Sequence, residues 1–158
     1  MDEHSGAHIN TAVFPYSRIS EVPLKLIRQT LITSFEKWGK PDWIKVDNGR
    51  PFGDPTLEQI TKTALWLIAY GIKVIWNRPR VPQDNAKVER SQGILANWVN
   101  PKECQSHEDL QTKVSAEGEF YNQHFPNRRM KHKTKFNCFP QLLIIRGTKN
   151  ADLQSNKN

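Results

Sequence analysis

The chain has 158 residues, enough for one ordinary domain, and 37% of them are hydrophobic and 25% charged. Its net charge of +7 favours a polyanionic partner, with nucleic acid first, although a basic protein without such a partner has the same composition. No apolar run reaches the roughly 20 residues of a membrane span. Cys104 and Cys138 lack zinc-site or disulfide-framework spacing, so we expect reduced thiols in a cytoplasmic protein with no membrane partner.

Strand and helix patterns alternate along the first two thirds of the chain. Runs of β-branched and aromatic residues predict strands at 8–14, 43–47 and 72–76. Apolar residues at spacings of three and four predict helices at 22–38, 53–71, 84–98 and 106–121. This order predicts an α/β domain, in which chemistry usually gathers at the carboxyl ends of the strands.

Capping residues support three of these helices. Gly39 would end the first, and Ser106 with Asp109 would form a capping box at the start of the last. Asp54 would be the N-cap of the second helix. The buried stripe of that helix would consist of Leu57, Ile60, Ala64, Leu67 and Ile68.

The region after residue 125 is strongly basic. Between 126 and 149 there is no acidic residue, and the basic residues are Arg128, Arg129, Lys131, Lys133, Lys135, Arg146 and Lys149. The stretch 125–135 is typical of a phosphate-binding arm, and equally of a solvated basic linker. The last residues have the composition of a frayed tail.

Two carboxylates occupy positions where they could act together. Asp47 closes one predicted strand, and Glu89 lies on the helix that follows the next strand. If these strands are neighbours, two hard oxygen ligands meet at the sheet edge and suit Mg²⁺ or Mn²⁺, as in phosphoryl transfer. The alternatives are equally simple. Asp-Asn-Gly is a common turn, and a glutamate between Lys87 and Arg90 is typical of a solvated helix face.

The loop between the third strand and the next helix is basic and stiffened by two prolines. Its cationic residues would hold a nucleic-acid backbone, and they are Arg78, Arg80, Lys87 and Arg90. The five tryptophans are predicted to pack in the core. Trp76, just before the loop, is the best candidate among them for stacking on a base.

From about residue 2 to residue 140 the chain resembles the integrase-type catalytic core of bacterial insertion-sequence transposases, the DDE group with a ribonuclease H-like fold. The matching segments are "DEHSG" (2–6), "WGKPDWIKVDNGRPFG" (38–53), "LWLIAYGIKVIWNRPRVPQDNAKVERSQG" (65–93) and "YNQHFPNRR" (121–129). The resemblance implies a sheet of five strands and DNA strand transfer with Mg²⁺ or Mn²⁺. It makes Asp47 and Glu89 the catalytic metal ligands, and it puts Gln83 and Asn85 in a mobile loop that approaches DNA.

The start of the chain departs from the family pattern. The family's first catalytic aspartate lies on a first strand, whereas "DEHSG" resembles the turn after the second strand. We therefore expect a ribonuclease H-like core without its first two strands, with Asp2 as a turn residue and the segment 8–14 without its strand neighbour. A site with two of three carboxylates would be inactive alone, so whether this chain is an enzyme stays open.

On this resemblance, residues 1–125 would be a partial catalytic core and residues 126–158 a basic extension and tail. DNA would be the partner, in a homo-oligomer or a mixed oligomer with a full-length transposase. The alternative function is a non-catalytic protein that binds DNA, or that pairs with a transposase and inhibits it. The sequence pattern leaves both open.

Overall fold

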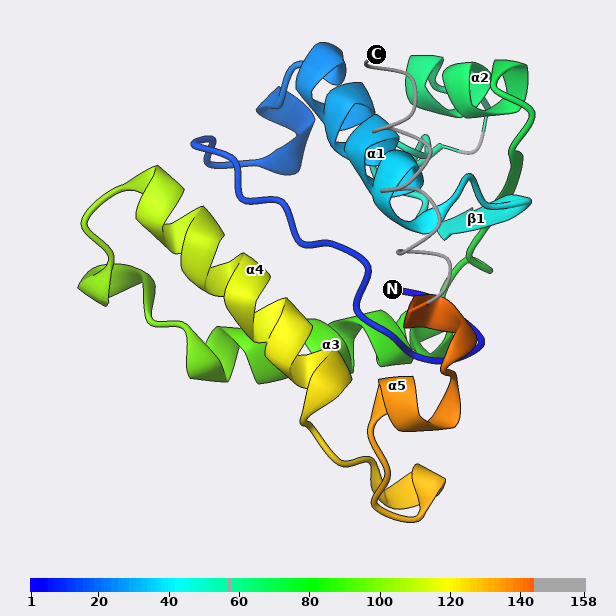
Figure 1. The fold of residues 1–158 in the computed structure, drawn as a ribbon. Coiled ribbons are helices and arrows are strands. Elements are labelled where there is room, and N and C mark those ends of the chain that lie inside the picture. Colours follow the sequence, from blue (N-terminus) through cyan, green and yellow to red (C-terminus); the bar gives the residue numbers. More distant parts are fainter. Residues whose placement is uncertain (57, 144–158) are drawn as a thin grey trace, which may run out of the picture.

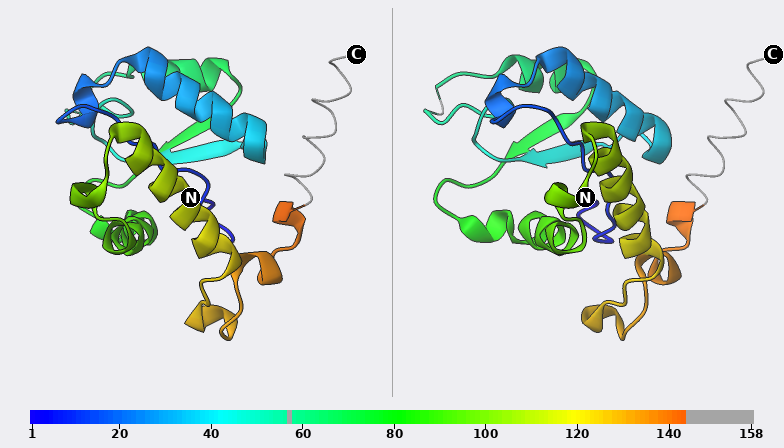
Figure 2. Two further views of the ribbon diagram at one scale, coloured as in Figure 1. Left: turned by 60° about the vertical axis from the view of Figure 1, so that its left-hand side comes forward. Right: turned by 90° about the vertical axis from the view of Figure 1, so that its left-hand side faces the viewer.

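The structure, a computed structural model, describes residues 1–56 and 58–143. The α-helices of this part of the chain are α1 (Leu24–Trp38), α2 (Lys62–Ala69), α3 (Ala86–Trp98), α4 (His107–Gln123) and α5 (Lys135–Cys138). Its strands are β1 (Trp43–Val46) and β2 (Lys73–Trp76). The pair of strands lies between α1 and α2 on one side and α3 on the other (Figures 1 and 2). Of the described helices, none is long and apolar enough to cross a membrane.

The two strands form a parallel pair. Their register runs from Trp43 opposite Lys73 to Val46 opposite Trp76. Parallel neighbours need a crossover, and α2 supplies it, so β1, α2 and β2 make one β-α-β unit. The predicted strands at 43–47 and 72–76 are confirmed. The sheet within the described residues has two strands rather than the three predicted from the sequence, so the expected α/β class holds in the coarser sense of a mixed helix–strand fold.

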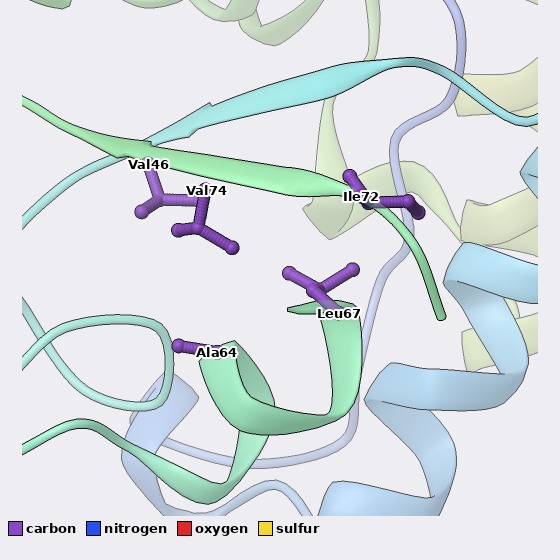
Figure 3. Packing of buried hydrophobic residues seen from close by; sticks show 5 residues of the cluster. All are labelled: Val46, Ala64, Leu67, Ile72 and Val74. Atoms are coloured by element: carbon purple, nitrogen blue, oxygen red, sulfur yellow. The ribbon is translucent and has the colours of Figure 1, made fainter. Parts of the chain in front are cut away.

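The main core lies between α2 and the inner face of this strand pair. Ala64 and Leu67 of α2 are fully buried and point toward strand residues on the opposite wall (Figure 3). That wall consists of Val46, Ile72 and Val74. Partly buried side chains extend this cluster, and they are Leu31, Phe35, Ile44, Phe52 and Trp66. Burying a leucine of this kind contributes about 2 kcal/mol. The cluster therefore holds β1 and β2 against α2, and this packing sets the position of the loops that follow the two strands.

The helix α2 is shorter than its sequence predicts, and the prediction of a helix from residue 53 is wrong. The N-cap is Thr61, whose hydroxyl accepts a hydrogen bond from the Ala64 N–H at 3.2 Å. The carboxylate of Asp54 bonds instead to the Thr56 hydroxyl and to the Gln59 N–H. An aspartate that bonds to its own neighbours in this way favours a turn over a helix.

The buried stripe is correspondingly shorter. Ile60 and Ile68 are 56% and 48% exposed, against complete burial for Leu67. Leu57 lies outside the described residues. Of the predicted stripe, the helix α2 therefore buries only the part formed by Ala64 and Leu67.

The other helix boundaries follow their capping residues. α1 ends directly before Gly39, which has a φ of 96° that favours glycine. α4 begins after Ser106, whose hydroxyl accepts from the Asp109 N–H at 3.2 Å. Both boundaries are confirmed, and so is the helix predicted near residues 84–98. Cys104 and Cys138 are free thiols, as expected.

The helices α3 and α4 are joined by aromatic side chains. The ring centroid of Trp98 lies 5.7 Å from that of Phe120 and 5.3 Å from that of Phe125, both in edge-to-face arrangement. Tyr121 stacks on Phe125 at 5.3 Å. Such pairs contribute about 0.5–1.5 kcal/mol each beyond the area that they bury. Trp98 is therefore partly buried between α3 and α4, but Trp43 and Trp76 are 41% and 37% exposed, contrary to the prediction that the tryptophans pack in the core.

The segment 8–14 is not a strand, contrary to the prediction. It runs as extended chain between α1 and α4, and its residues 9–13 make no backbone–backbone hydrogen bond to another described residue. Side chains take the place of a neighbouring strand. Asn122 of α4 accepts from the His8 N–H at 2.7 Å and donates to the His8 carbonyl at 2.8 Å.

A second amide does the same at the other end of this segment. Gln111 of α4 accepts from the Val13 N–H at 2.8 Å and donates to the Thr11 carbonyl at 3.0 Å. From the opposite side, the Trp38 indole N–H donates to the Ile9 carbonyl at 3.0 Å. The segment 8–14 is therefore anchored by helix side chains, which satisfy part of the hydrogen bonding that a sheet would supply.

Candidate functional site

The loop after β1 presents Asp47 at the carboxyl end of the strand. Its exposed carboxylate accepts a hydrogen bond from the Gly49 N–H at 3.2 Å. The Gly49 carbonyl in turn accepts from the Gly53 N–H at 2.9 Å, which curls the loop back onto the strand end. A Cβ at Gly53 would lie 2.6 Å from the Cα of Asn48, so the close approach requires glycine there.

A chain of three amides connects this strand end to α3. The Asn48 side chain donates to the Asn77 carbonyl at 3.0 Å, and the Asn77 side chain donates to Asn85 Oδ1 at 2.6 Å. The Asn85 carbonyl accepts from the Glu89 N–H at 3.0 Å, within the first turn of α3. The residue after Asp47 is therefore linked, through Asn77 and Asn85, to the helical turn that carries Glu89. The Glu89 side chain itself is exposed.

The loop between β2 and α3 is closed by Asp84. This carboxylate binds the Arg78 guanidinium at 2.8 and 3.2 Å, accepts from the Arg78 N–H at 2.9 Å, and lies 3.8 Å from the Lys45 Nζ. The Lys45 ammonium also donates to the Asp84 carbonyl at 3.1 Å. The hydrogen bonds from Arg78 hold the pKa of Asp84 far below its usual range. Arg78 thus closes the loop while its side chain stays 72% exposed.

The remaining predicted contact residues divide into two groups. Arg80, Gln83 and Arg90 are exposed, and Arg80 has a φ of 60°, uncommon for a residue with a side chain. Arg80 lines a shallow hollow beside the strand end with Asn48, Gly49, Pro55 and Pro79. Lys87 turns to the N-terminal segment, where its Nζ donates to the Glu3 carbonyl at 2.9 Å and pairs with its carboxylate at 3.2 Å.

Three positioning residues of this site were not predicted from the sequence: Lys45, Asn77 and Asp84. Asn77 has no local pattern in the sequence, and only the structure shows that it is 7% exposed at the end of β2. A buried asparagine at a strand end needs partners for its amide, and here these are the loop and the helix start. Lys45 and Asp84 give no signal either, since charged residues are common in strands and turns of the surface.

The donor atoms at this site include oxygens that suit a hard cation. The Oδ1 atoms of Asn48 and Asn77 are buried and have no hydrogen-bond partner, and the carboxylates of Asp47 and Glu89 are exposed. Amide and carboxylate oxygens are ligands that Mg²⁺ and Mn²⁺ accept. Among residues 1–56 and 58–143, no group of three or more His, Cys, Asp or Glu side chains could hold a metal ion.

Asp2 has another role. Its carboxylate accepts from the Ser5 N–H at 2.7 Å and from the Ser5 hydroxyl, and its backbone N–H donates to the Ala7 carbonyl at 2.8 Å. It is a turn residue, as expected from the resemblance. The Asp2 carboxylate is therefore used within the N-terminal turn and adds no oxygen donor to those at the strand ends.

Comparison with known proteins gives a likeness of fold. No protein-family model matches the chain. Part of the structure of a simian T-cell lymphotropic virus intasome, solved in complex with PP2A regulatory subunit B56 gamma, matches it with a TM-score of 0.52 and 16% sequence identity. The match covers 73% of this chain, which spans 40% of the length of the chain that it matches. The protein is thus similar in fold to a chain of a viral intasome.

Proposed function

We propose that the chain is a catalytic core of the DDE transposase and integrase type, with ribonuclease H-like ancestry, that binds DNA and serves metal-dependent strand transfer. The observation that carries this proposal is the amide chain from Asn48 through Asn77 to Asn85. It ties the strand end that bears Asp47 to the helical turn that bears Glu89. The likeness to an intasome chain and the transposase-like motifs around both carboxylates support it.

Each residue then has a definite task. Asp47 and Glu89 would hold Mg²⁺ or Mn²⁺, and the bound ion would supply positive charge for the phosphodiester oxygens. Arg80, Gln83 and Arg90 would face the DNA backbone, because they are exposed and Arg80 lines the hollow beside the strand end. Two carboxylates without a third give a weak site. We therefore expect low metal affinity and low activity for this chain alone.

Three further residues would act mainly through the loop. Arg78 is held by Asp84, so its contribution to DNA binding is the charge of an exposed guanidinium in a fixed place. The side-chain oxygen of Asn85 accepts a hydrogen bond from Asn77, and the ammonium group of Lys87 pairs with Glu3. These three residues would shape the DNA-facing loop more than they grip DNA.

The second candidate is a non-catalytic protein that binds DNA, alone or in a mixed oligomer with a transposase. One observation favours it. The described residues hold no group of three acidic side chains of the kind that two-metal phosphoryl transfer uses. The basic loop would serve DNA binding equally well without chemistry.

The test is nicking of supercoiled DNA by the purified chain with Mg²⁺ or Mn²⁺, and DNA binding on the same sample. Asp47→Asn with Glu89→Gln removes both carboxylates, and Glu36→Gln with Asp42→Asn, at exposed positions on α1 and before β1, is the matched control. Nicking that only the first pair abolishes supports the catalytic core. DNA binding without nicking favours the second candidate. A folded chain that binds no DNA contradicts both.

A further inference from the structure

The basic stretch after α4 forms a closed loop. Asn127 and Lys133 form an antiparallel bridge, in which the Asn127 N–H donates to the Lys133 carbonyl at 3.0 Å. The His132 N–H donates back to the Asn127 carbonyl at 3.0 Å. Lys131 and His132 have φ values of 53° and 62°, which turn the chain sharply. The 127–133 loop is therefore a defined structure and not an extended linker.

The 127–133 loop concentrates positive charge, and its described side chains form no ion pair. The side chains of Arg128, Lys131, His132 and Lys133 are exposed. No ion pair between described residues includes any of them, and no Asp or Glu occurs between residues 124 and 143. Like charges held within one small loop repel each other. A polyanion that neutralises several of them at once gains counterion-release free energy.

Most of the backbone N–H groups of the 127–133 loop are already occupied. Those of Met130, Lys131, His132 and Lys133 all donate to carbonyl oxygens of the same loop. These four groups are therefore not available to an anion. Contact with a partner would rely mainly on the long cationic side chains, which bind phosphates without reading bases.

The position of the 127–133 loop favours a large polyanion. The loop projects beyond α5 at one extremity of the molecule, away from the strand pair (Figures 1 and 2). A membrane surface fits less well, because interfacial segments insert apolar side chains, and the one apolar residue here, Met130, is half-buried.

We propose that the 127–133 loop is a contact for the phosphate backbone of double-stranded nucleic acid, separate from the residues around Asp47 and Glu89. The contact needs neither a metal nor strand transfer, so an absence of catalysis does not affect it, whereas a folded chain that binds no DNA would contradict this proposal and the proposed function alike. Arg128, Lys131 and Lys133 carry it, and it is insensitive to base sequence.

The test compares two triple variants that lose the same charge. Arg128→Gln, Lys131→Gln and Lys133→Gln remove three charges of the loop, and Lys25→Gln, Lys73→Gln and Lys102→Gln remove three exposed charges elsewhere. Binding of a fluorescent duplex of mixed sequence is measured by anisotropy with EDTA, across a series of KCl concentrations. Circular dichroism and thermal melting check that both variants fold like the parent chain.

The loop variant should bind at least about ten-fold more weakly, and its slope of log K against log salt should fall by about 2 to 3. The control variant should keep most of the slope. Equal slopes for the two variants would overturn the proposal. Loop-dependent binding to vesicles of anionic lipid, with duplex binding unchanged, would overturn it in favour of a membrane contact.

Discussion

Asn122 pairs with the backbone of His8 in the way that a neighbouring β-strand would, accepting from its N–H at 2.7 Å and donating to its carbonyl at 2.8 Å. Both residues are buried, with exposures of 1% for Asn122 and 8% for His8. One amide therefore satisfies two main-chain groups that would otherwise be buried without partners. The stability of the N-terminal half depends on this pair.

Replacing Asn122 by alanine should lower the free energy of unfolding by about 2–4 kcal/mol, because it leaves a buried N–H and a buried carbonyl unpaired. Urea denaturation followed by tryptophan fluorescence measures this loss. Gln123→Ala, at the exposed next position of α4, is the control and should change stability by less than about 0.5 kcal/mol. Equal effects of the two variants would contradict the role of Asn122.

Replacing Gly118 by alanine should also destabilise the protein. A Cβ there would lie 2.5 Å from Cδ2 of His8, whose ring is held by the Thr11 hydroxyl at 3.0 Å. Such overpacking costs about 1–3 kcal/mol. Gly93→Ala provides the matched control, because no atom lies within 4 Å of the added Cβ on α3. It should stabilise by up to about 1 kcal/mol through helix propensity, and thermal melting of both variants distinguishes the outcomes.

Stability should depend on pH through His8. Burial lowers the pKa of His8 from 6.5 to about 4, with smaller effects of the N-terminal amino group, Glu119 and Lys37. The unfolded chain takes up this proton at a higher pH than the folded chain. The contribution of neutral His8 to the free energy of unfolding is therefore fully present above about pH 6.5. It is lost as the pH drops toward about 4, by a total of about 3 kcal/mol.

Urea denaturation of the parent chain and of His8→Gln across this pH range measures the effect. The variant should lose most of the slope below about pH 6.5, since glutamine does not titrate. His124→Gln, at an exposed position, should keep the parent slope. If His8→Gln keeps the full slope, other groups cause the acid sensitivity.

Removing the side-chain amide of Asn77, the middle residue of the chain from Asn48 to Asn85, should open the loop between β2 and α3. Asn77→Ala breaks the link to Asn85 and leaves Asp84, with its bonds to Arg78 and Lys45, to hold the loop. Trypsin should then cleave after Arg80 several-fold faster under native conditions, because cleavage follows local opening. Asn97→Ala, exposed on α3, is the control. Unchanged cleavage in Asn77→Ala would show that Asp84 alone holds the loop.

Local signals in the sequence predicted a good part of the fold. The boundary at Gly39 and the cap at Ser106 follow from the chemistry of those two residues alone, and both are where they were expected. The segment 8–14 has strand composition, but a strand also needs a neighbour, and composition does not supply one. Asp54 has cap chemistry, yet its carboxylate bonds within a turn, a choice that local sequence does not reveal.

The candidate site was predictable only as separate parts. Asp47 was placed at a strand end and Glu89 near a helix start by periodicity and capping patterns, and the structure has both there. What connects them is a pair of hydrogen bonds made by Asn77, a residue with no pattern of its own, to Asn48 and to Asn85. These bonds depend on how β1, β2 and the loop pack together, so no local rule finds them.

The pairing of α4 with the segment 8–14 also specifies alignment. A helix rises about 1.5 Å per residue and an extended chain about 3.3 Å. The eleven residue steps from Gln111 to Asn122 therefore cover about the same 16 Å as the five steps from Val13 to His8. Two neighbouring strands can slip by two residues and pair again, because their rises are equal. The helix and the extended chain differ in their rise per residue, so Gln111 and Asn122 both meet their partners in this one alignment. A slip of the segment in either direction would therefore break all four hydrogen bonds at once.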